Sequence, residues 1–379
     1  MPSERFRTVM GWRRDWTGAH NRDVLNRRYE YLRDRPSGEV AYIRQLVRWA
    51  RDARLLLARE LAWPIYDELH MVDDTFCCSD PFGLLGFVDV PGDDPLLVQR
   101  RFEALCLADL GVAMFELELA DSMDRVEADL ASMLALINGK IMSRDTVDLV
   151  IYTYHDPNDM YSARGVSFGE PGSFPGLYER RHMSRCRISR DGIIFRSKTR
   201  PKDPFRSLVK IMRQMDAPTS GKDSFLIKDR CAFQFVTKDA TSAAALAAQI
   251  RHCLEVAGAH VFDDGDNLTA DTGHQANVEN GMSSRKYRKK QMVALWHGRW
   301  YEFQFLTFQD YYGSRYALDD ANHVIYKLRQ GLTGVLPVFF PGPIYLEEGT
   351  WDSDGLKTML YERQIENLGW HLRRNGCQH

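Results

Sequence analysis

The chain has 379 residues, of which 44% are hydrophobic and 27% are charged, and its formal net charge at neutral pH is -2. This composition is typical of a globular protein of two or three domains and excludes an intrinsically disordered chain. The seven cysteines include no Cys-x-x-Cys pair, no apolar stretch is long enough to cross a membrane, and the start of the chain lacks the apolar core of a signal peptide, so we expect a reduced protein in the cytoplasm without a membrane partner.

The first 142 residues are expected to form an all-helical region. Apolar residues recur at helical spacing over 40–61, after a Ser37 cap, and a second periodic run begins at Asp94-Pro95. A third run stops at Asn138-Gly139 and consists of Val126, Leu130, Met133 and Ile137.

Strand patterns dominate from residue 143 to residue 330. The run TVDLVIYTYH predicts a strand, whereas the Gly- and Pro-rich segment 164–176 is expected to be irregular. Segment 185–200 predicts a hairpin in which Asp191 and Gly192 supply the positive φ angles of a tight turn.

The second half of this region predicts alternating strands and helices. We expect in order a helix at 205–214, a strand at 230–237, a helix at 241–257, an acidic loop at 262–271, a hairpin at 291–307 that turns at His297-Gly298, and a helix at 311–329. A Pro-rich connector and a final helix are expected over 331–379. The fold class is therefore α+β, with a mixed β-sheet flanked by helices and a helical N-terminal region.

The last predicted strand has two different faces. Tyr301, Phe303 and Phe305 fall on one side and are expected to bury against helices, while Glu302 and Gln304 fall on the other side. An antiparallel strand with one solvent-exposed face would explain the polar side without assigning Glu302 or Gln304 a function.

Several familiar sites are absent from the sequence. It contains no G-x-G-x-x-G, no Walker loop and no H-E-x-x-H. His155-Asp156 lacks the companion histidines of a metal-dependent phosphohydrolase, and the acidic cluster at 263–266 is expected to be a solvated turn rather than a cation site.

Polar features that suit phosphate chemistry follow one another along the strand region. A basic strand exit comes first, then Asp229 at a strand entrance, then the basic run 283–291 with Tyr287 inside it, and finally the pair Glu302 and Gln304. Two carboxylates can hold a divalent cation against a polyphosphate, and fixed cations neutralise the phosphate charge. Because simple alternation places Asp229 on the same side of its strand as the core positions, opposite Gln234, the chain must bend there for its carboxylate to approach Glu302. The basic exit consists of Arg196, Lys198, Arg200 and Lys202.

In this order the features resemble the synthetase domain of RelA/SpoT-type alarmone synthetases, which move pyrophosphate from ATP to the 3'-hydroxyl of a guanosine nucleotide. The resemblance covers about a third of the chain. The matching elements are Arg200-Pro201-Lys202 followed by Ser207, the strand DRCAFQFV from Asp229, the loop at Tyr287-Arg288, the strand with Glu302, Gln304 and Thr307, and the helix with His323, Tyr326 and Lys327.

The resemblance implies a nucleotidyltransferase-like synthetase fold and a role for each matching residue. Asp229 and Glu302 are expected to hold Mg²⁺, and Glu302 is also expected to orient and deprotonate the attacking hydroxyl. ATP would contact Arg196, Lys198, Arg200, Lys202, Ser207 and Arg288. The acceptor would contact Tyr287, whose ring would stack on its base, and also Gln234, Gln304, His323 and Lys327.

Four positions depart from the family pattern and leave the acceptor open. Gln234 and Leu306 stand where the family has arginines, Gln291 stands for a histidine and Lys286 for a glycine. A guanosine nucleotide, an adenosine nucleotide and a tRNA 3' end are all candidate acceptors. The alternative is an inactive relative that binds nucleotide or RNA. Residues 1–142 are a candidate module for self-inhibition, for a regulatory partner or for homo-oligomer formation.

Overall fold

In the computed structural model of the protein, the described residues are 94–120, 122–156, 159–170, 177–202, 229–269, 287–316 and 339–345, with Gly92, Ser207, Glu362 and scattered helical positions between 41 and 55. Most of the helix expected at 40–61, the helix expected at 205–214, and His323 and Lys327 lie outside these residues. The chain divides into two compact units, one built from 1–122, 203–226 and 328–364 and the other from 123–202, 227–327 and 365–379. Among the described helices, none is both long and apolar enough to span a membrane.

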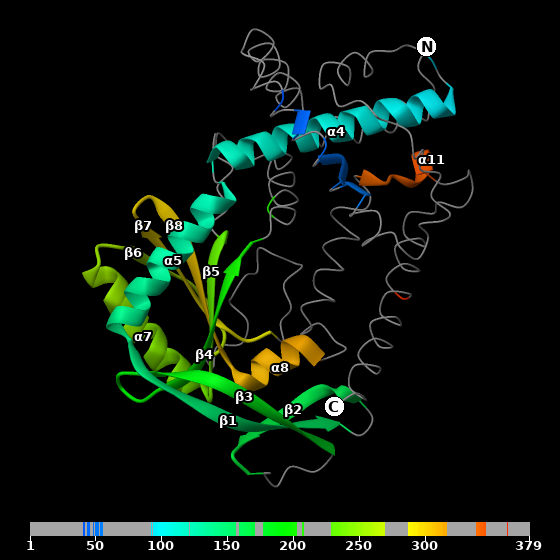
Figure 1. Ribbon diagram of the computed structural model, residues 1–379. Helices are drawn as coiled ribbons and strands as arrows, with labels where there is room; N and C mark the ends of the chain where they lie inside the picture. The colour runs from blue at the N-terminus through cyan, green and yellow to red at the C-terminus, as the bar shows by residue number, and fades with distance from the viewer. Residues whose placement is uncertain are drawn as a thin grey trace. The chain divides into compact units, whose positions relative to one another are not determined.

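The first unit contains the long helix α4 (Pro95–Ala120) and the short helix α11 (Gly342–Tyr345) (Figure 1). Asp94 caps α4, because its Oδ1 accepts hydrogen bonds from the backbone N–H groups of Leu96 (2.9 Å) and Leu97 (3.3 Å), as the Asp94-Pro95 pair predicts. Arg54 joins the two helices by an ion pair with Glu103 (3.3 Å) and a hydrogen bond to Tyr345, all three side chains being buried.

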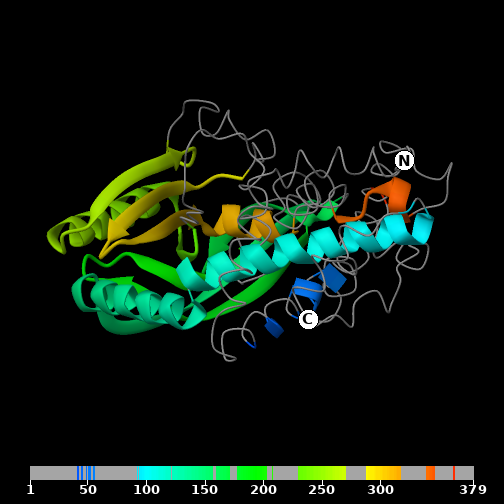
Figure 2. The ribbon, with the colours of Figure 1, turned by 90° about the horizontal axis from the view of Figure 1, so that it is seen from above.

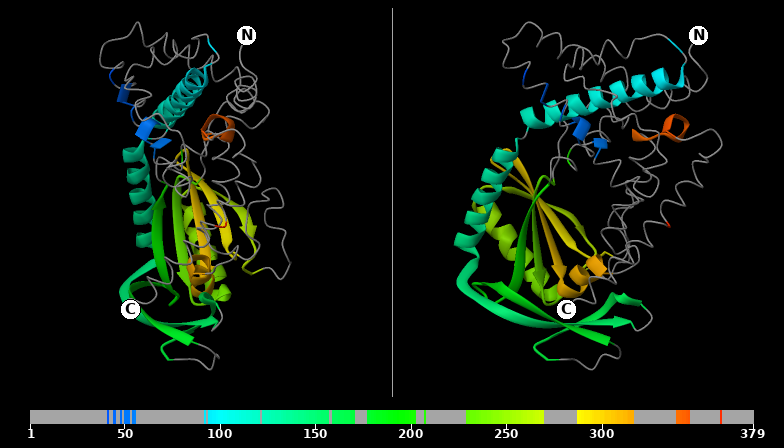
Figure 3. Two further views of the ribbon diagram at one scale, coloured as in Figure 1. Left: turned by 90° about the vertical axis from the view of Figure 1, so that its right-hand side faces the viewer. Right: turned by 45° about the vertical axis from the view of Figure 1, so that its right-hand side comes forward.

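The second unit is an α+β structure around one mixed, strongly curled sheet of eight described strands in the order β2-β1-β3-β4-β5-β8-β7-β6 (Figures 1 and 3). Only the β5·β8 pair is parallel among the described strands. Seen from above, β6 to β8 and β1 with β3 form the two limbs of the curl (Figure 2). The strands are β1 (Met142–Asp156), β2 (Asp159–Phe168), β3 (Leu177–Ser189), β4 (Ile194–Pro201), β5 (Cys231–Thr237), β6 (His260–Asp266), β7 (Lys290–Trp296) and β8 (Arg299–Thr307).

Three described helices belong to the second unit: α5 (Met123–Lys140), α7 (Ala240–Val256) and α8 (Phe308–Tyr316). Helix α5 buries the four residues of its predicted apolar stripe, Val126, Leu130, Met133 and Ile137. Helix α8 begins at Phe308 rather than at the expected Tyr311. The reason is a local cap, in which the Thr307 hydroxyl accepts a hydrogen bond from the backbone N–H of Asp310 (3.1 Å).

The two predicted hairpins form, with one difference in the backbone. His297 and Gly298 both have positive φ (48° and 75°), as the two-residue turn between β7 and β8 requires. At the other hairpin only Gly192 does (φ 80°), and the expectation for Asp191 was wrong. The Gly192 N–H donates to the Ser189 carbonyl (2.9 Å), so a turn comes first and Gly192 forms the bulge after it. The Asp191 carboxylate instead accepts a hydrogen bond from Gln249 on α7 (2.8 Å).

Two segments expected to be irregular are strands. Arg164 to Phe168 belong to β2, where Val166 and Phe168 pair with Thr153 and Ile151 of β1 and pack against a buried cluster around α8. The expected acidic loop begins inside β6, an edge strand paired with β7. Its carboxylates suit an edge, because charges there discourage pairing with another chain.

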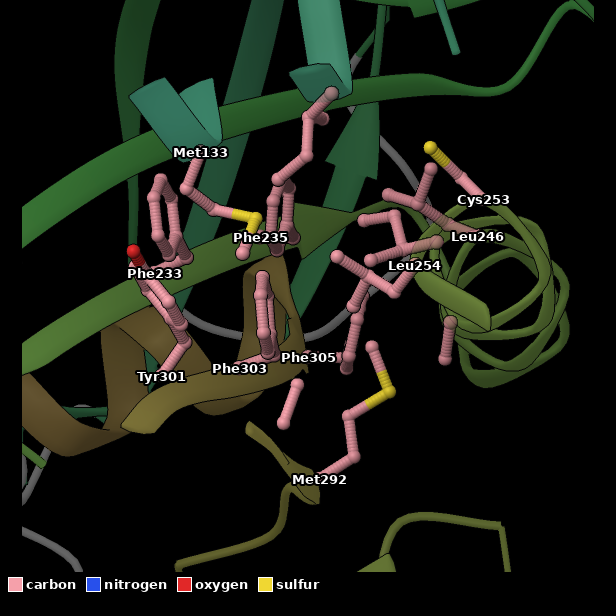
Figure 4. Packing of buried hydrophobic residues seen from close by; sticks show 14 of the residues in the cluster. Met133, Phe233, Phe235, Leu246, Cys253, Leu254, Met292, Tyr301, Phe303 and Phe305 are labelled. Atoms are coloured by element: carbon pink, nitrogen blue, oxygen red, sulfur yellow. The ribbon is translucent and has the colours of Figure 1, made fainter. Parts of the chain in front are cut away.

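The main core lies between one face of the central strands and the helices α5 and α7 (Figure 4). Phe233 of β5 stacks on Phe303 of β8, and Phe235 stacks on Phe305, with 5.3 Å between ring centroids in each pair. Tyr301 is buried in the same cluster, so the prediction for the aromatic side of β8 is confirmed. The even-numbered residues of β8 therefore point to the opposite face of the sheet.

Candidate functional site

The face of the central strands opposite the aromatic core carries an array of polar side chains from four neighbouring strands, with Ala232, Val236 and Val293 between them. Lys198 of β4 lies beside Gln234 of β5, Gln234 lies beside Gln304 of β8, and Gln304 lies beside Gln291 of β7. Residues paired across strands project to the same side of a sheet, so strand register alone brings these segments together. We call this array the polar face; its members are Arg196, Lys198, Arg200, Gln234, Gln291, Glu302 and Gln304.

A chain of hydrogen bonds orients Glu302, the carboxylate at the centre of the polar face. The Arg200 guanidinium donates to the Gln304 Oε1 (3.2 Å), and the Gln304 amide nitrogen donates to the Glu302 Oε1. Glu302 is buried, so its carboxylate depends on such partners for its orientation. The sequence predicted that Arg200, Glu302 and Gln304 share a site, and the three are in direct hydrogen-bond contact.

Tyr287 lies against the polar face, in the segment that precedes β7. Its hydroxyl is hydrogen-bonded to Gln234. Burial, together with the charges of Glu302 and Asp310, raises the pKa of Tyr287 to about 12, which outweighs the opposite effects of Arg200 and of the bond to Gln234. The hydroxyl therefore stays protonated at neutral pH. The Tyr287 carbonyl accepts a hydrogen bond from the Asn267 side chain (3.0 Å), which anchors this segment.

Lys289 follows Tyr287 and reaches the same face. Its backbone N–H donates to the Asn267 Oδ1 (2.7 Å), and its ammonium group donates to the Gln291 Oε1 and lies 5.9 Å from the centre of the Tyr287 ring. Burial lowers the pKa of Lys289, although the negative charges of Glu302, Asp264 and Asp229 oppose that shift. Sequence reasoning missed Lys289, because nothing in the basic run distinguishes it from its neighbours.

Arg288, predicted to contact ATP, is exposed. Its guanidinium donates to the Leu268 carbonyl (2.8 Å), in the turn that follows β6. Asp266 at the end of β6 pairs with Lys290 (2.8 Å) and accepts a hydrogen bond from the Thr269 N–H (2.9 Å). These contacts lower the pKa of Asp266 to about 2 in spite of its partial burial. The acidic cluster is thus engaged in strand and turn contacts rather than forming the expected solvated turn.

Asp229 and Lys202 form an ion pair with 2.6 Å between Oδ2 and Nζ, and both side chains are mostly buried. A turn and bend at Asp229–Arg230 precede β5, as the prediction for Asp229 requires. The Lys202 N–H also donates to the Arg230 carbonyl (3.0 Å), so two hydrogen bonds hold the end of β4 next to the entrance of β5.

The surroundings of Asp229 and Glu302 suit positively charged side chains better than a resident metal ion. Asp229 already binds Lys202, Glu302 accepts a hydrogen bond from Gln304, and the charge of Lys289 acts on both carboxylates. Within the described part of the chain, no three His, Cys, Asp or Glu side chains are grouped closely enough to hold a metal ion. Two carboxylates with these partners leave few oxygen ligands for a divalent cation.

Four positively charged side chains gather at the β4 end of the polar face. Lys198 is exposed, yet its pKa is lowered, by partial desolvation first and then by the charges of Arg315, Arg200 and Arg196. Like charges placed this close repel one another, so the group is suited to an anion. Arg315, whose guanidinium lies 4.5 Å from the centre of the Tyr311 ring on α8, was not predicted from the sequence.

The remaining predicted residues are Ser207, His323 and Lys327. Ser207 belongs to the first unit, where its side chain is buried. His323 and Lys327 lie outside the described residues. The structure thus brings together Arg196, Lys198, Arg200, Tyr287, Gln234, Glu302 and Gln304, with the Asp229–Lys202 pair at the adjoining strand ends.

Comparison with known proteins finds no relative of this chain. No family model matches the sequence. Neither the curated proteins nor the solved structures contain a match. The residues and contacts of the polar face are therefore the basis for any functional assignment.

Proposed function

We propose that the polar face binds ATP and an acceptor, and that the protein transfers the pyrophosphoryl group of ATP to a hydroxyl of that acceptor, as the alarmone synthetases that its motifs resemble do. One observation carries the proposal: Arg200 of one motif forms a hydrogen-bonded chain with Glu302 and Gln304 of another on one sheet face, beside the bond between Tyr287 and Gln234. The mixed sheet with helices on its aromatic side supports a synthetase-like fold for the second unit.

The positively charged end of the face is the proposed phosphate site. Arg196, Lys198, Arg200 and Arg315 would neutralise the triphosphate, and the arginines offer paired N–H donors that match phosphate oxygens. Positive charge fixed in advance stabilises the charge spread over the oxygens of the transferring group and the charge that develops on the departing α-phosphate oxygen in the transition state. Magnesium enters this proposal as part of the ATP substrate rather than as a resident ion.

Glu302 is the proposed general base. It would take the proton of the acceptor hydroxyl as that oxygen attacks the β-phosphorus of ATP. The new bond joins the acceptor oxygen to the β-phosphorus, the bond from the β-phosphorus to the oxygen of the α-phosphate breaks, and AMP leaves. Gln304 and Arg200 act as positioning residues, because they fix the orientation of the Glu302 carboxylate.

The neutral side chains of the face are the proposed contacts for the acceptor. Gln234 and Gln291 present amides where the resembling family has charged or ionisable groups, so they would hydrogen-bond a base without adding charge. The Tyr287 hydroxyl is protonated and can donate a hydrogen bond to the same base. A guanosine or adenosine nucleotide and the 3' end of a tRNA fit this chemistry, and regulation or self-association through residues 1–142 belongs to the same proposal.

A second candidate, a protein that binds nucleotide or RNA without catalysis, has its own support. Both acidic groups that the chemistry would use are engaged in the free protein, Asp229 with Lys202 and Glu302 with Gln304. A carboxylate held by a partner is a weaker base until that partner moves. Such a protein would use the same cationic surface for phosphate binding alone.

Product analysis separates the two candidates. The full chain, incubated with labelled ATP, Mg²⁺ and a panel of guanosine nucleotides, adenosine nucleotides and tRNA, should release AMP in equal amount to one pyrophosphorylated acceptor. Control reactions without acceptor should release little AMP. If ATP binds but no acceptor yields AMP, the binding protein replaces the enzyme as the conclusion.

A further inference from the structure

Asn267, the residue that follows β6, binds the segment before β7 through both its side chain and its backbone. Its Nδ2 donates to the Tyr287 carbonyl (3.0 Å), and its Oδ1 accepts a hydrogen bond from the Lys289 N–H (2.7 Å). Its own backbone N–H donates to the Lys289 carbonyl (3.2 Å). The Asn267 side chain therefore supplies the donor and the acceptor of a peptide unit, and it continues the ladder beyond the last register pair, Asp266 with Lys290.

The turn that carries Asn267 is itself fixed. The Asp266 Oδ1 accepts hydrogen bonds from the backbone N–H groups of Leu268 (3.1 Å) and Thr269 (2.9 Å), the pattern of an Asx turn. Leu268 is buried in the main core. A side chain that extends from an anchored backbone loses little conformational freedom when it binds, so Asn267 is suited to hold a residue that lies outside a strand, as Tyr287 does.

Tyr287 is held at two points. It lies three positions before the start of β7. Its carbonyl is bound by Asn267, and its hydroxyl is bonded to Gln234 on the polar face. The bond from Asn267 thus fixes the main chain from which the ring reaches the sheet.

We propose that Asn267 is a positioning residue, which holds the Tyr287 ring against Gln234 where the acceptor binds. This inference rests on the proposed function, in which Tyr287 contacts the acceptor. The position requires an amide side chain, because it must donate to one backbone group and accept from another. An aspartate would still accept from the Lys289 N–H, but it would place an oxygen against the Tyr287 carbonyl.

The test measures nitration of Tyr287 by tetranitromethane in the full chain without nucleotide, followed by peptide mass mapping. This reagent attacks the ionised phenol, and the pKa of Tyr287 is raised to about 12, first of all by burial, so the wild type should react slowly at this position. In Asn267→Ala, exposure of the ring to water should increase the nitration rate of Tyr287 at least about tenfold. Asn267→Asp should show the same increase, because it lacks the donor for the Tyr287 carbonyl.

Steady-state kinetics with the best acceptor give the second measurement. Both Asn267 variants should raise the KM of the acceptor at least about fivefold and change ATP affinity by less than about threefold, because the loss is confined to the acceptor contact. Thr269→Ala is the matched control, since its hydroxyl binds Asp266 within the same turn. The control should keep the wild-type nitration rate and the wild-type KM.

Two results would overturn the inference. One is an Asn267→Asp protein that nitrates Tyr287 at the wild-type rate, which would assign Asn267 to the bond with Lys289 alone; the other is faster nitration with an unchanged acceptor KM. The buried Tyr301 should stay unreactive in a folded protein, and if it reacts in Asn267→Ala, the Asn267→Asp variant decides. Because nitration requires neither nucleotide nor turnover, its outcome is separate from that of the product analysis.

Discussion

Replacing Glu302 with glutamine is expected to reduce AMP release from ATP by about 10²- to 10⁴-fold while changing ATP affinity by less than about threefold. Glutamine has the size of glutamate and still offers an oxygen to the Gln304 amide, so the hydrogen-bonded chain from Arg200 is preserved. The substitution removes the group that accepts the proton of the acceptor hydroxyl. Steady-state rates with the best acceptor and calorimetric titration with ATP measure the two quantities separately.

Glu255→Gln is the matched control for this experiment. Glu255 lies on the exposed side of α7, paired with Arg251 one turn away, and the helix packs on the aromatic face of the sheet. The same chemical change there should leave the rate and the ATP affinity as they are. A Glu302→Gln protein with the wild-type rate would exclude Glu302 as the general base.

Replacing Phe303 with alanine is expected to lower the free energy of unfolding by about 3–5 kcal/mol. Phe303 is fully buried, at 0% exposure, and its ring stacks on Phe233 between the sheet and the helices α5 and α7. Truncation removes a large apolar surface and leaves a cavity that close-packed neighbours cannot fill. Urea unfolding followed by circular dichroism gives the difference.

Phe262→Ala provides the comparison, because it deletes the same atoms at a different depth. Phe262 lies on the edge strand β6 and is 48% exposed, with one ring contact to Trp300 at 5.8 Å. The loss there should stay below about 1.5 kcal/mol, in keeping with partial burial. Equal losses for the two phenylalanines would contradict a core centred on β5 and β8.

Local patterns were enough to predict the strands that carry the site. Alternation placed Tyr301, Phe303 and Phe305 on one side of β8, and the structure buries all three. The dipeptide His297-Gly298 predicted the turn before β8, where both residues adopt positive φ. Each of these features is decided by side chains within a few residues of one another, so no knowledge of the rest of the fold was needed.

The errors fall where partners distant in sequence decide the conformation. Glycines and prolines made the segment around Val166 look irregular, but residues 165–168 pair in continuous register with β1. The acidic cluster at Asp263 became part of β6 because β7 lies beside it. Strand pairing between separate segments overrides local preference in both cases.

Register also explains why two charged residues of the site were missed. Lys289 and Lys290 are adjacent in sequence, yet one reaches the polar face and the other pairs with Asp266. Arg315 acts on Lys198 together with the arginines of β4 because α8 packs against the sheet, which the local sequence pattern does not reveal. The contact between Tyr287 and Gln234 was also not predicted. It depends on Asn267, whose side chain binds the Tyr287 carbonyl and so anchors the segment before β7.

The claim that the polar face binds nucleotide phosphates is tested most directly by calorimetric titration of ATP into Lys198→Met and Arg187→Met. Lys198 lies among Arg196, Arg200 and Arg315, whereas Arg187 is an exposed arginine that pairs in register with Phe195 and so projects from the other face. We predict that Lys198→Met weakens ATP binding at least about tenfold without lowering the unfolding temperature, because its charge is held among like charges in the free protein. Arg187→Met should bind ATP as the wild type does. Equal affinities for the two variants would contradict the assignment of the phosphate site to the polar face.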